Sequence, residues 1–223
     1  MKQEALTKED MELLTRYGLA ELPLQGVFAE LVKKGGLLCM QEQPLTRLML
    51  MAKGRAKVSI GAAHGGACLM AFFDQEGIIG DLELMNGNEN ASTTVQALCE
   101  TRLIVFPFSL YREALLINNT FLRIIATTLA KKLSARSVNS ARFVLYPLKT
   151  RLMAYLSMAA EKGVFTEKLT ELSELLGVSY RHLHRTLLEL VEEGILKKER
   201  RGYAVLREDA LLSAREQAGY YLF

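Results

Sequence analysis

The stretch LTELSELLGVSYRHLHRTLLELVEEGIL, residues 169–196, decides the fold of the last third of the chain. Thr170 is a suitable N-cap for a first short helix, and Gly177 is a suitable end for it. Ser179 is a suitable N-cap for a second helix, which should stop at Gly194. Two helices joined by a short turn that contains glycine are typical of a helix-turn-helix motif.

The segment that follows, ILKKERRGYAVL (residues 195–206), predicts a β-hairpin. Two short runs suited to strands flank a basic turn that contains Gly202. Such a hairpin beside a helix-turn-helix would be a wing. From Arg207 to the last residue the pattern predicts a helical extension of unknown purpose.

The second helix carries two of the three histidines of the chain. Arg181, His184 and Arg185 are three and four residues apart, so they share one face of this helix, with Tyr180 beside them. His182 and His184 lie about 200° apart around a helix and cannot converge on one metal ion. No nucleophile or acid pair is set beside them, so neither a metal site nor an enzyme is expected.

The position of this cluster points to DNA. Residues 178–187 contain no acidic residue, whereas the end of the helix carries Glu189, Glu192 and Glu193. Base-reading side chains lie at the start of the second helix of a helix-turn-helix, and arginine can pair with guanine there. The backbone N–H groups after the N-cap suit a phosphate. The residues predicted to contact DNA are Ser179, Tyr180, Arg181, His182, His184 and Arg185 in the helix, and Lys197, Lys198, Arg200 and Arg201 in the wing.

The N-terminal half of the chain has a different texture. Over residues 22–106, glycines recur every several positions and separate short apolar runs such as RLMLMA (47–52) and LIVF (103–106). In RAKVSI (55–60), apolar and polar residues alternate, as in a half-buried strand. Many short strands with turn residues between them predict a β sandwich or barrel.

A long helix should follow, from Asn118 or Asn119 to about Val144. It would end before Pro147, and the next helix, LKTRLMAYLSMAAEKG, would run to Gly163. The apolar stripe of the long helix could pack on its own β domain or on a twin helix in a homodimer. Its members are Leu122, Ile125, Leu129 and Leu133.

Composition sets further bounds. The 28 Lys and Arg residues barely exceed the 25 Asp and Glu residues, so the placement of the charges matters more than their sum. No apolar run approaches a membrane span, and the charged start MKQEALTKEDMELL is unlike a signal peptide, so a cytoplasmic protein is expected. Cys39, Cys68 and Cys99 are too far apart for a metal-ligand pair and are expected to be reduced thiols, mostly in or near a core; a redox role for one of them is the alternative.

Taken together, these segments resemble the CRP/FNR family of bacterial transcription regulators. The resemblance is carried by PLTRLMLMAKGRAKVSI (44–60), by residues 72–106 and by residues 169–196. Within them, the segments IIGDLELMNG and LGVSYRHL are most similar to the YeiL-like branch. It implies an α+β fold with a jelly-roll-like sensor domain over 1–118, similar to cyclic-nucleotide-binding domains. A dimerisation helix and hinge over 119–146 and a winged helix-turn-helix DNA-binding domain over 147–223 would follow.

The recognition helix departs from the pattern of many family members, in which an Arg-Glu pair is followed by another arginine. The matching positions are Tyr180, Arg181 and Arg185, so only the last is retained. The operator sequence familiar from those members is therefore not expected here.

The sensor domain departs further. Members that bind cyclic nucleotides hold ribose and phosphate with a Gly-Glu and a downstream Arg-Ser, and the matching residues are Gly80, Asp81, Ala91 and Ser92. Alanine supplies no guanidinium to the phosphate, so cyclic AMP is not expected to bind. The oxygen-sensing members hold an iron–sulfur cluster with N-terminal cysteines, and residues 1–38 contain none, so no cluster is expected.

The sequence thus favours a dimeric regulator that binds a palindromic DNA site, with an unidentified small-molecule effector or none. RNA polymerase is a further partner that this role admits. The alternative is a sensor module whose basic helix docks a protein instead of DNA; the basic wing beside an acid-free helix start favours DNA.

Overall fold

The computed structural model of the chain describes residues 2–61 and 66–218; over 135–145 it describes the course of the helix and not the side chains. It divides into two compact units. One contains the described residues of 1–58 and 73–134, and the other those of 59–72 and 135–221. The three-part division predicted from the sequence stays a prediction.

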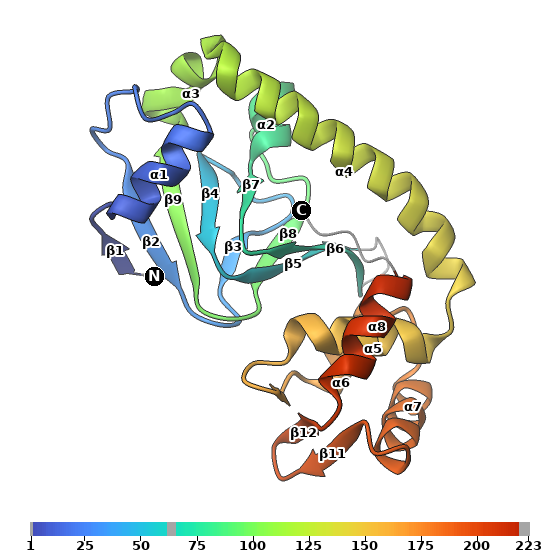
Figure 1. Cartoon of the computed structure of the whole chain (residues 1–223). Helices are drawn as coiled ribbons and strands as arrows, with labels where there is room; N and C mark the ends of the chain where they lie inside the picture. Colours follow the sequence, from blue (N-terminus) through green and yellow to red (C-terminus); the bar gives the residue numbers. More distant parts are fainter. Residues whose placement is uncertain (1, 62–65, 219–223) are drawn as a thin grey trace. The chain divides into compact units, whose positions relative to one another are not determined.

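Two sheets build the N-terminal part, as predicted for a jelly-roll-like domain (Figure 1). The first is a five-stranded antiparallel sheet in the order β1-β2-β9-β4-β7. Its strands are β1 (Lys2–Glu4), β2 (Phe28–Val32), β4 (Arg47–Lys53), β7 (Gly77–Ile79) and β9 (Thr101–Pro107). Four successive residues of β4, Leu48 to Met51, are fully buried, so both faces of this interior strand are covered. That explains the unbroken apolar run RLMLMA.

The second sheet has four strands in the order β3-β8-β5-β6. They are β3 (Leu37–Cys39), β5 (Arg55–Gly61), β6 (Ala67–Asp74) and β8 (Thr94–Ala97). The half-buried alternation predicted for β5 is wrong, because Lys57 and Ser59 are only 6% and 8% exposed. Both faces of this strand are therefore covered, and its polar residues are buried along with its apolar ones.

Helices cover one face of the five-stranded sheet. They are α1 (Lys8–Arg16), α2 (Asp81–Asn86), α3 (Phe108–Ile117) and the first part of α4 (Asn119–Leu145). Their apolar residues form one core cluster with β4, β7 and β9. Helix α1 was not predicted from the sequence, although Thr7 and Asp10 form a capping box at its start.

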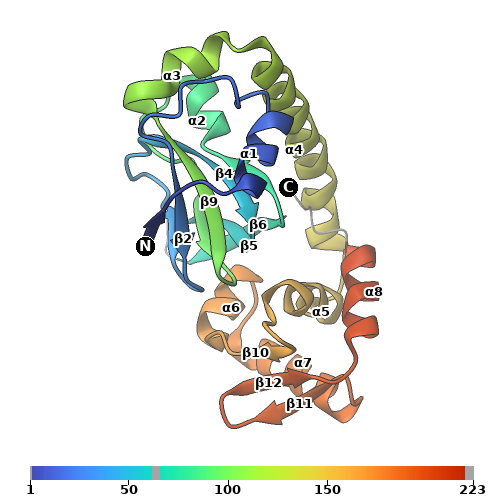
Figure 2. The ribbon, with the colours of Figure 1, turned by 60° about the vertical axis from the view of Figure 1, so that its left-hand side comes forward.

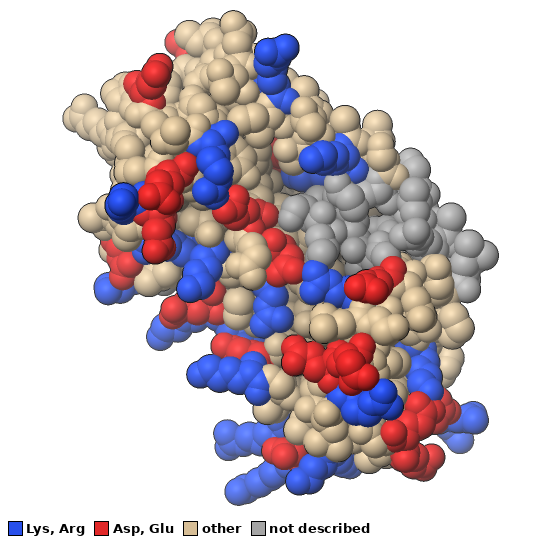
Figure 3. Space-filling model, viewed as in Figure 1, with Lys and Arg blue, Asp and Glu red and all other residues tan. Residues whose placement is uncertain are grey.

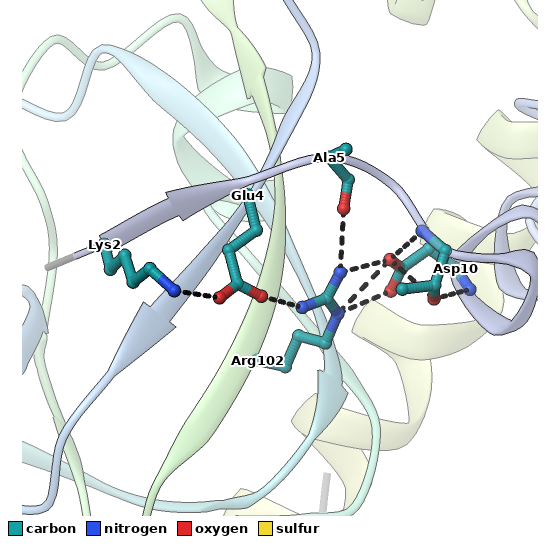
Figure 4. A network of polar contacts seen from close by, with 6 residues as sticks. Lys2, Glu4, Ala5, Asp10 and Arg102 are labelled. Carbon is teal, nitrogen blue, oxygen red and sulfur yellow. Dashed lines mark hydrogen bonds and ion pairs between the residues drawn. The ribbon is translucent and has the colours of Figure 1, made fainter.

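A polar network fastens α1 to the sheet (Figure 4). The guanidinium of Arg102, on β9, donates to both carboxylate oxygens of Asp10 at 2.7 to 3.2 Å and to Glu4 at 2.9 Å. It also donates to the carbonyl oxygen of Ala5 at 3.1 Å. Burial alone would raise the pKa of Asp10, which is 1% exposed, but the hydrogen bonds from Arg102 and Thr7 outweigh it and lower this pKa. The start of the chain is thus held by charge as well as by packing.

The long helix α4 begins as predicted. The side chain of Asn118 accepts a hydrogen bond from the Phe121 N–H at 3.0 Å and donates to the Gly18 carbonyl at 2.7 Å. One member of the predicted seam needs correction: Ile125 is fully buried and lies with Phe121 in the core of its own domain. Leu129 packs against that core, whereas Leu133 is 69% exposed and Leu122 is half-buried.

The second unit holds the predicted winged helix-turn-helix. Helix α5 (Leu148–Ala159) is followed by β10 (Val164–Phe165), α6 (Leu169–Leu175), α7 (Tyr180–Glu192), β11 (Leu196–Glu199), β12 (Gly202–Val205) and α8 (Glu208–Ala218). The last three strands form a sheet in the order β10-β12-β11, and α8 packs along α5 (Figure 2). The helical extension predicted after Arg207 is therefore confirmed over Glu208–Ala218, and its predicted residues 219–223 lie outside the part of the chain that the structure describes.

Two predicted helix boundaries in this unit are wrong. Helix α5 ends at Ala159, before Gly163, because residues 161–164 turn into β10. Helix α6 starts two residues early, with Lys168 at the N-cap position and no side-chain capping bond, so Thr170 does not cap it.

Gly202 is required by the path of β12. Its φ of +120° lies in the region that favours glycine, and an added Cβ would come within 2.0 Å of the Phe165 carbonyl oxygen. This close approach seats β12 against β10 and sets the base of the wing.

Candidate nucleic-acid interface

Helix α7 is anchored by its apolar side. Leu183, Leu187 and Leu190 are fully buried, and the Thr186 hydroxyl donates to the His182 carbonyl at 3.1 Å. The predicted N-cap is confirmed, because the Ser179 hydroxyl oxygen accepts a hydrogen bond from the His182 N–H at 3.2 Å. The leucine spacing and the cap thus determine which face of the helix turns inward and where the helix begins.

The turn before α7 is supported from α5. Gly177, in this turn, has a φ of +63°. The Arg151 guanidinium donates to the carbonyl oxygen of Leu176, the C-cap of α6, at 2.9 Å. Within the same unit, the buried Tyr155 donates its hydroxyl hydrogen to Glu167 at 2.6 Å. Both ends of α6 are therefore held from α5 by a polar contact.

The outward face of α7 carries two parallel rows, each spaced by four residues. In the aromatic row, the rings of Tyr180 and His184 stack with centroids 6.1 Å apart and planes 17° from parallel. Tyr180 is 50% exposed. The other row, Arg181 and Arg185, is exposed and cationic. His182 is also exposed, but it lies outside both rows.

One contact in the cationic row was not anticipated. The Arg185 Nε atom lies 3.3 Å from the Glu189 carboxylate, one turn later in the helix, and both side chains are exposed. Within the described part of the chain the two terminal Nη groups of Arg185 have no hydrogen-bond or ion-pair partner. Glu193, at the end of the helix, pairs with Lys149 of α5 at 2.6 Å. Two of the three carboxylates at the end of α7, those of Glu189 and Glu193, are thus paired, while the first two turns hold no carboxylate.

The wing presents a second group of cations. Lys197 and Lys198 on β11, and Arg200 and Arg201 in its turn, are all exposed. None of the four has an ion-pair partner among the residues that the structure describes. In the space-filling view, Lys and Arg side chains project from the edge where Figure 1 draws β11 and β12 (Figure 3). Tyr203, on β12, is buried beneath them at 4% exposure. The ten residues predicted to contact DNA therefore come from two adjacent elements of one unit.

The predicted effector residues meet around α2. Gly80 takes a φ of +90°, and a Cβ there would lie 3.0 Å from the Arg47 carbonyl oxygen. Asp81 is 4% exposed, and its carboxylate accepts hydrogen bonds from the Lys132 ammonium of α4 at 2.7 and 3.0 Å. Lys132 also donates to the Ile78 carbonyl at 3.1 Å and lies 5.5 Å from the centre of the Phe73 ring. Asp81 is thus paired within the protein itself.

The downstream pair of predicted effector residues, Ala91 and Ser92, is also hydrogen-bonded within the protein. The Ser92 N–H donates to the buried carboxylate of Glu83 at 2.7 Å. Ala91 is 4% exposed, and its N–H donates to the Gln43 carbonyl at 2.9 Å. Neither Glu83 nor Lys132 was identified from the sequence, because the spacing of Glu83 marks it only as a helix residue and Lys132 lies 51 residues from Asp81.

The remaining candidates are separate from both sites. The three cysteines are free; Cys39 and Cys99 are half-buried, but Cys68 is exposed, so the expectation of a core position is wrong for it. Burial raises the pKa of the Cys39 thiol to about 12. Among the residues with a described position, no three His, Cys, Asp or Glu side chains lie close enough to share a metal ion. In that same part of the chain no helix has the length and apolarity to cross a membrane.

Comparisons with known proteins agree with this architecture. Residues 29–118 match the cyclic nucleotide-binding domain family. The regulatory protein YeiL of Escherichia coli O157:H7 is 34% identical over 158 residues, which make up 71% of this chain and 72% of that protein.

Two solved structures share the fold. A CRP/FNR family transcriptional regulator from Thermus thermophilus has a TM-score of 0.64 at 19% identity, with 84% of this chain and 98% of that one covered. A protein described as a CRP/FNR family regulator, from Eubacterium rectale, has a TM-score of 0.70 at 17% identity, with 95% of each chain covered.

Proposed function

Because the chain belongs to the CRP/FNR family of transcription regulators, we propose that it binds a specific DNA sequence and regulates transcription from it. The observation that carries this proposal is the outward face of α7. Its first two turns present Tyr180, Arg181, His184 and Arg185 without a carboxylate, on a helix whose opposite side is locked by buried leucines. A helix held in this way can enter the major groove by its N-terminal end.

The contacts divide into those that read bases and those that position the protein. Arg181 and Arg185 are suited to the O6 and N7 acceptors of guanine, and Tyr180 and His184 to neighbouring base edges. The exposed Ser179, with His182 beside it, suits a phosphate at the helix N-terminus. The cations Lys197, Lys198, Arg200 and Arg201 would hold the flanking backbone and make the affinity dependent on salt.

We further propose that the protein acts as a homodimer through α4. Leu133 is exposed and Leu122 and Leu129 are half-buried, which leaves apolar area on a helix of 27 residues. Two copies related by a twofold axis would present two recognition helices to a palindromic site with half-sites about 34 Å apart. Ile125 contributes to its own domain and is not part of this interface.

Cyclic AMP is not the effector in this proposal. A cyclic phosphate needs hydrogen-bond donors and positive charge, yet the Ser92 N–H already serves the Glu83 carboxylate and no guanidinium stands at Ala91. The carboxylate would also repel a phosphate that approached the same N–H. Ligand binding to a folded protein raises its unfolding temperature, so millimolar cyclic AMP should leave the temperature unchanged. A clear rise would contradict this part of the proposal.

The setting of this activity follows from the role. A regulator of this kind works in the cytoplasm, and RNA polymerase is the partner through which it would act on transcription. We propose three parts for this regulator: a sensor domain over 1–118, a dimerisation helix and hinge over 119–146, and a DNA-binding domain over 147–223.

The test is a mobility-shift titration with Arg185→Ala. Loss of a bidentate contact to guanine costs about 1–3 kcal/mol at each half-site, so the variant should lose its preference for the specific site over random DNA. Arg123→Ala, which removes an exposed arginine from α4, is the matched control and should retain it. If Arg185→Ala discriminated between specific and random DNA as well as the wild type, α7 would not be the recognition helix.

A further inference from the structure

The Tyr180–His184 ring pair has no role in the core of its unit. The buried side of α7 contains Leu183, Leu187 and Leu190, whereas Tyr180 is exposed and His184 is half-buried. Tyr180 keeps half of its surface exposed at the first position of the helix, where its stacking on His184 holds it in place. The pair therefore remains available for contacts outside the unit.

The rings offer the chemistry of an apolar contact. Guanine, cytosine and adenine show hydrogen-bonding groups in the major groove, whereas thymine alone adds a methyl group. An aromatic face packs well on a methyl group, and two stacked rings lose little conformational freedom when they do so.

The neighbouring row supplies the complementary chemistry. Arg185 meets Glu189 through its Nε edge at 3.3 Å, so its two Nη groups remain available to guanine O6 and N7. The two rows run side by side along the helix, one residue apart in sequence. An aromatic row beside a cationic row suits a base-pair step in which a thymine methyl group lies next to a guanine.

We infer that the Tyr180–His184 pair is a specificity determinant that recognises the 5-methyl group of a thymine beside the guanine read by Arg185. The inference rests on the proposed function, because it assumes that α7 enters the major groove. It goes further by naming the base that the aromatic row selects.

The experiment removes only the methyl group. In the DNA site that the wild-type protein selects from random sequence, each thymine is replaced in turn by deoxyuridine, and the dissociation constant is measured by fluorescence anisotropy. A buried methyl group is worth about a four-fold change in affinity, so one position per half-site should show a loss of about four-fold, and both half-sites together about fifteen-fold. Tyr180→Ala should bind thymine and uracil sites equally, whereas Tyr180→Phe should keep the preference.

Lys198→Gln is the matched control, since it should weaken binding to every site alike and still prefer thymine. The unfolding temperature of each variant shows that it is folded. Selective binding by the wild type that ignores every uracil replacement would overturn this inference alone, as would an unchanged methyl preference in Tyr180→Ala. If the wild type selected no sequence at all, the proposed function would fail and the inference with it.

Discussion

The charged side chains of the β domain and those of α7 and the wing are used in opposite ways. Around the five-stranded sheet, Asp10 and Asp81 are nearly fully buried, and each is bonded to a basic residue from a distant part of the chain. On α7 and the wing, Arg181, Lys198 and Arg200 are exposed, and within the described residues they have no ion-pair partner. A buried charge without a partner is costly, whereas an exposed cation costs little and stays available.

The charged residues therefore have different roles in the two regions. In the β domain the predicted effector residues and their neighbours hold the protein together: Asp81 ties α2 to α4, and Glu83 fixes the backbone at Ser92. Removing a charge should therefore reduce stability in the first region and DNA binding in the second. Substitutions in each region test this distinction.

The largest effect on stability is expected for Lys132→Met. It leaves the Asp81 carboxylate buried without a cation, which should lower the free energy of unfolding by about 3 kcal/mol. Chemical denaturation measures this change. Arg181→Met, on the exposed face of α7, should stay within about 0.5 kcal/mol of the wild type and lose affinity for DNA instead.

The double variant Asp81→Asn with Lys132→Met is the control for the ion pair. Since it removes both charges, it should recover part of the lost stability. If Lys132→Met were as stable as the wild type, the pair would not fasten α4 to the domain and the contrast would be lost.

A smaller effect, of about 2 kcal/mol at pH 7, is expected for Arg102→Met, because Asp10 loses its main hydrogen-bond donor. The Asp10 pKa is lowered in the folded protein, so the unfolded chain takes up this proton first as the pH falls. The wild type should therefore lose stability below about pH 5, and the gap between the two proteins should narrow toward pH 3. Denaturation curves at several pH values measure both trends; a constant gap would mean that the Asp10 charge is not involved.

The smallest single effects are expected in the wing. Lys198→Gln or Arg200→Gln should weaken binding to specific and random DNA alike, and each should reduce the slope of log affinity against log salt by about 1 for each half-site, or about 2 for the dimer. Glu199→Gln, which alters an exposed residue of the same hairpin without removing a cation, is the control. An unchanged slope in both cation variants would show that the wing does not touch phosphate.

The winged helix-turn-helix could be predicted in detail because its signals are local. Ser179 caps the helix that it precedes, Gly194 ends it, and the leucine spacing assigns the buried face of α7. The same reasoning failed for Thr170, because the backbone already turns into α6 at Lys168. The aromatic row was also within reach, since Tyr180 and His184 are four residues apart and must be neighbours on a helix.

The contacts of the β domain could not be predicted, because they join residues far apart in the sequence. Nothing near Lys132 marks Asp81 as its partner, and the apolar stripe of α4 does not reveal that Ile125 faces its own sheet. Helix α2 lies in a region where short apolar runs predicted only strands. It was not predicted because its six residues are too few to show a helical period.

Selection of binding sites from random DNA by the wild-type protein tests the central claim most directly. The account predicts an enriched palindrome with half-sites centred about 10 base pairs apart, each containing a guanine whose enrichment disappears in Arg185→Ala. Recovery of DNA without any shared sequence, or of the same palindrome by Arg185→Ala, would contradict the claim that the outward face of α7 reads DNA.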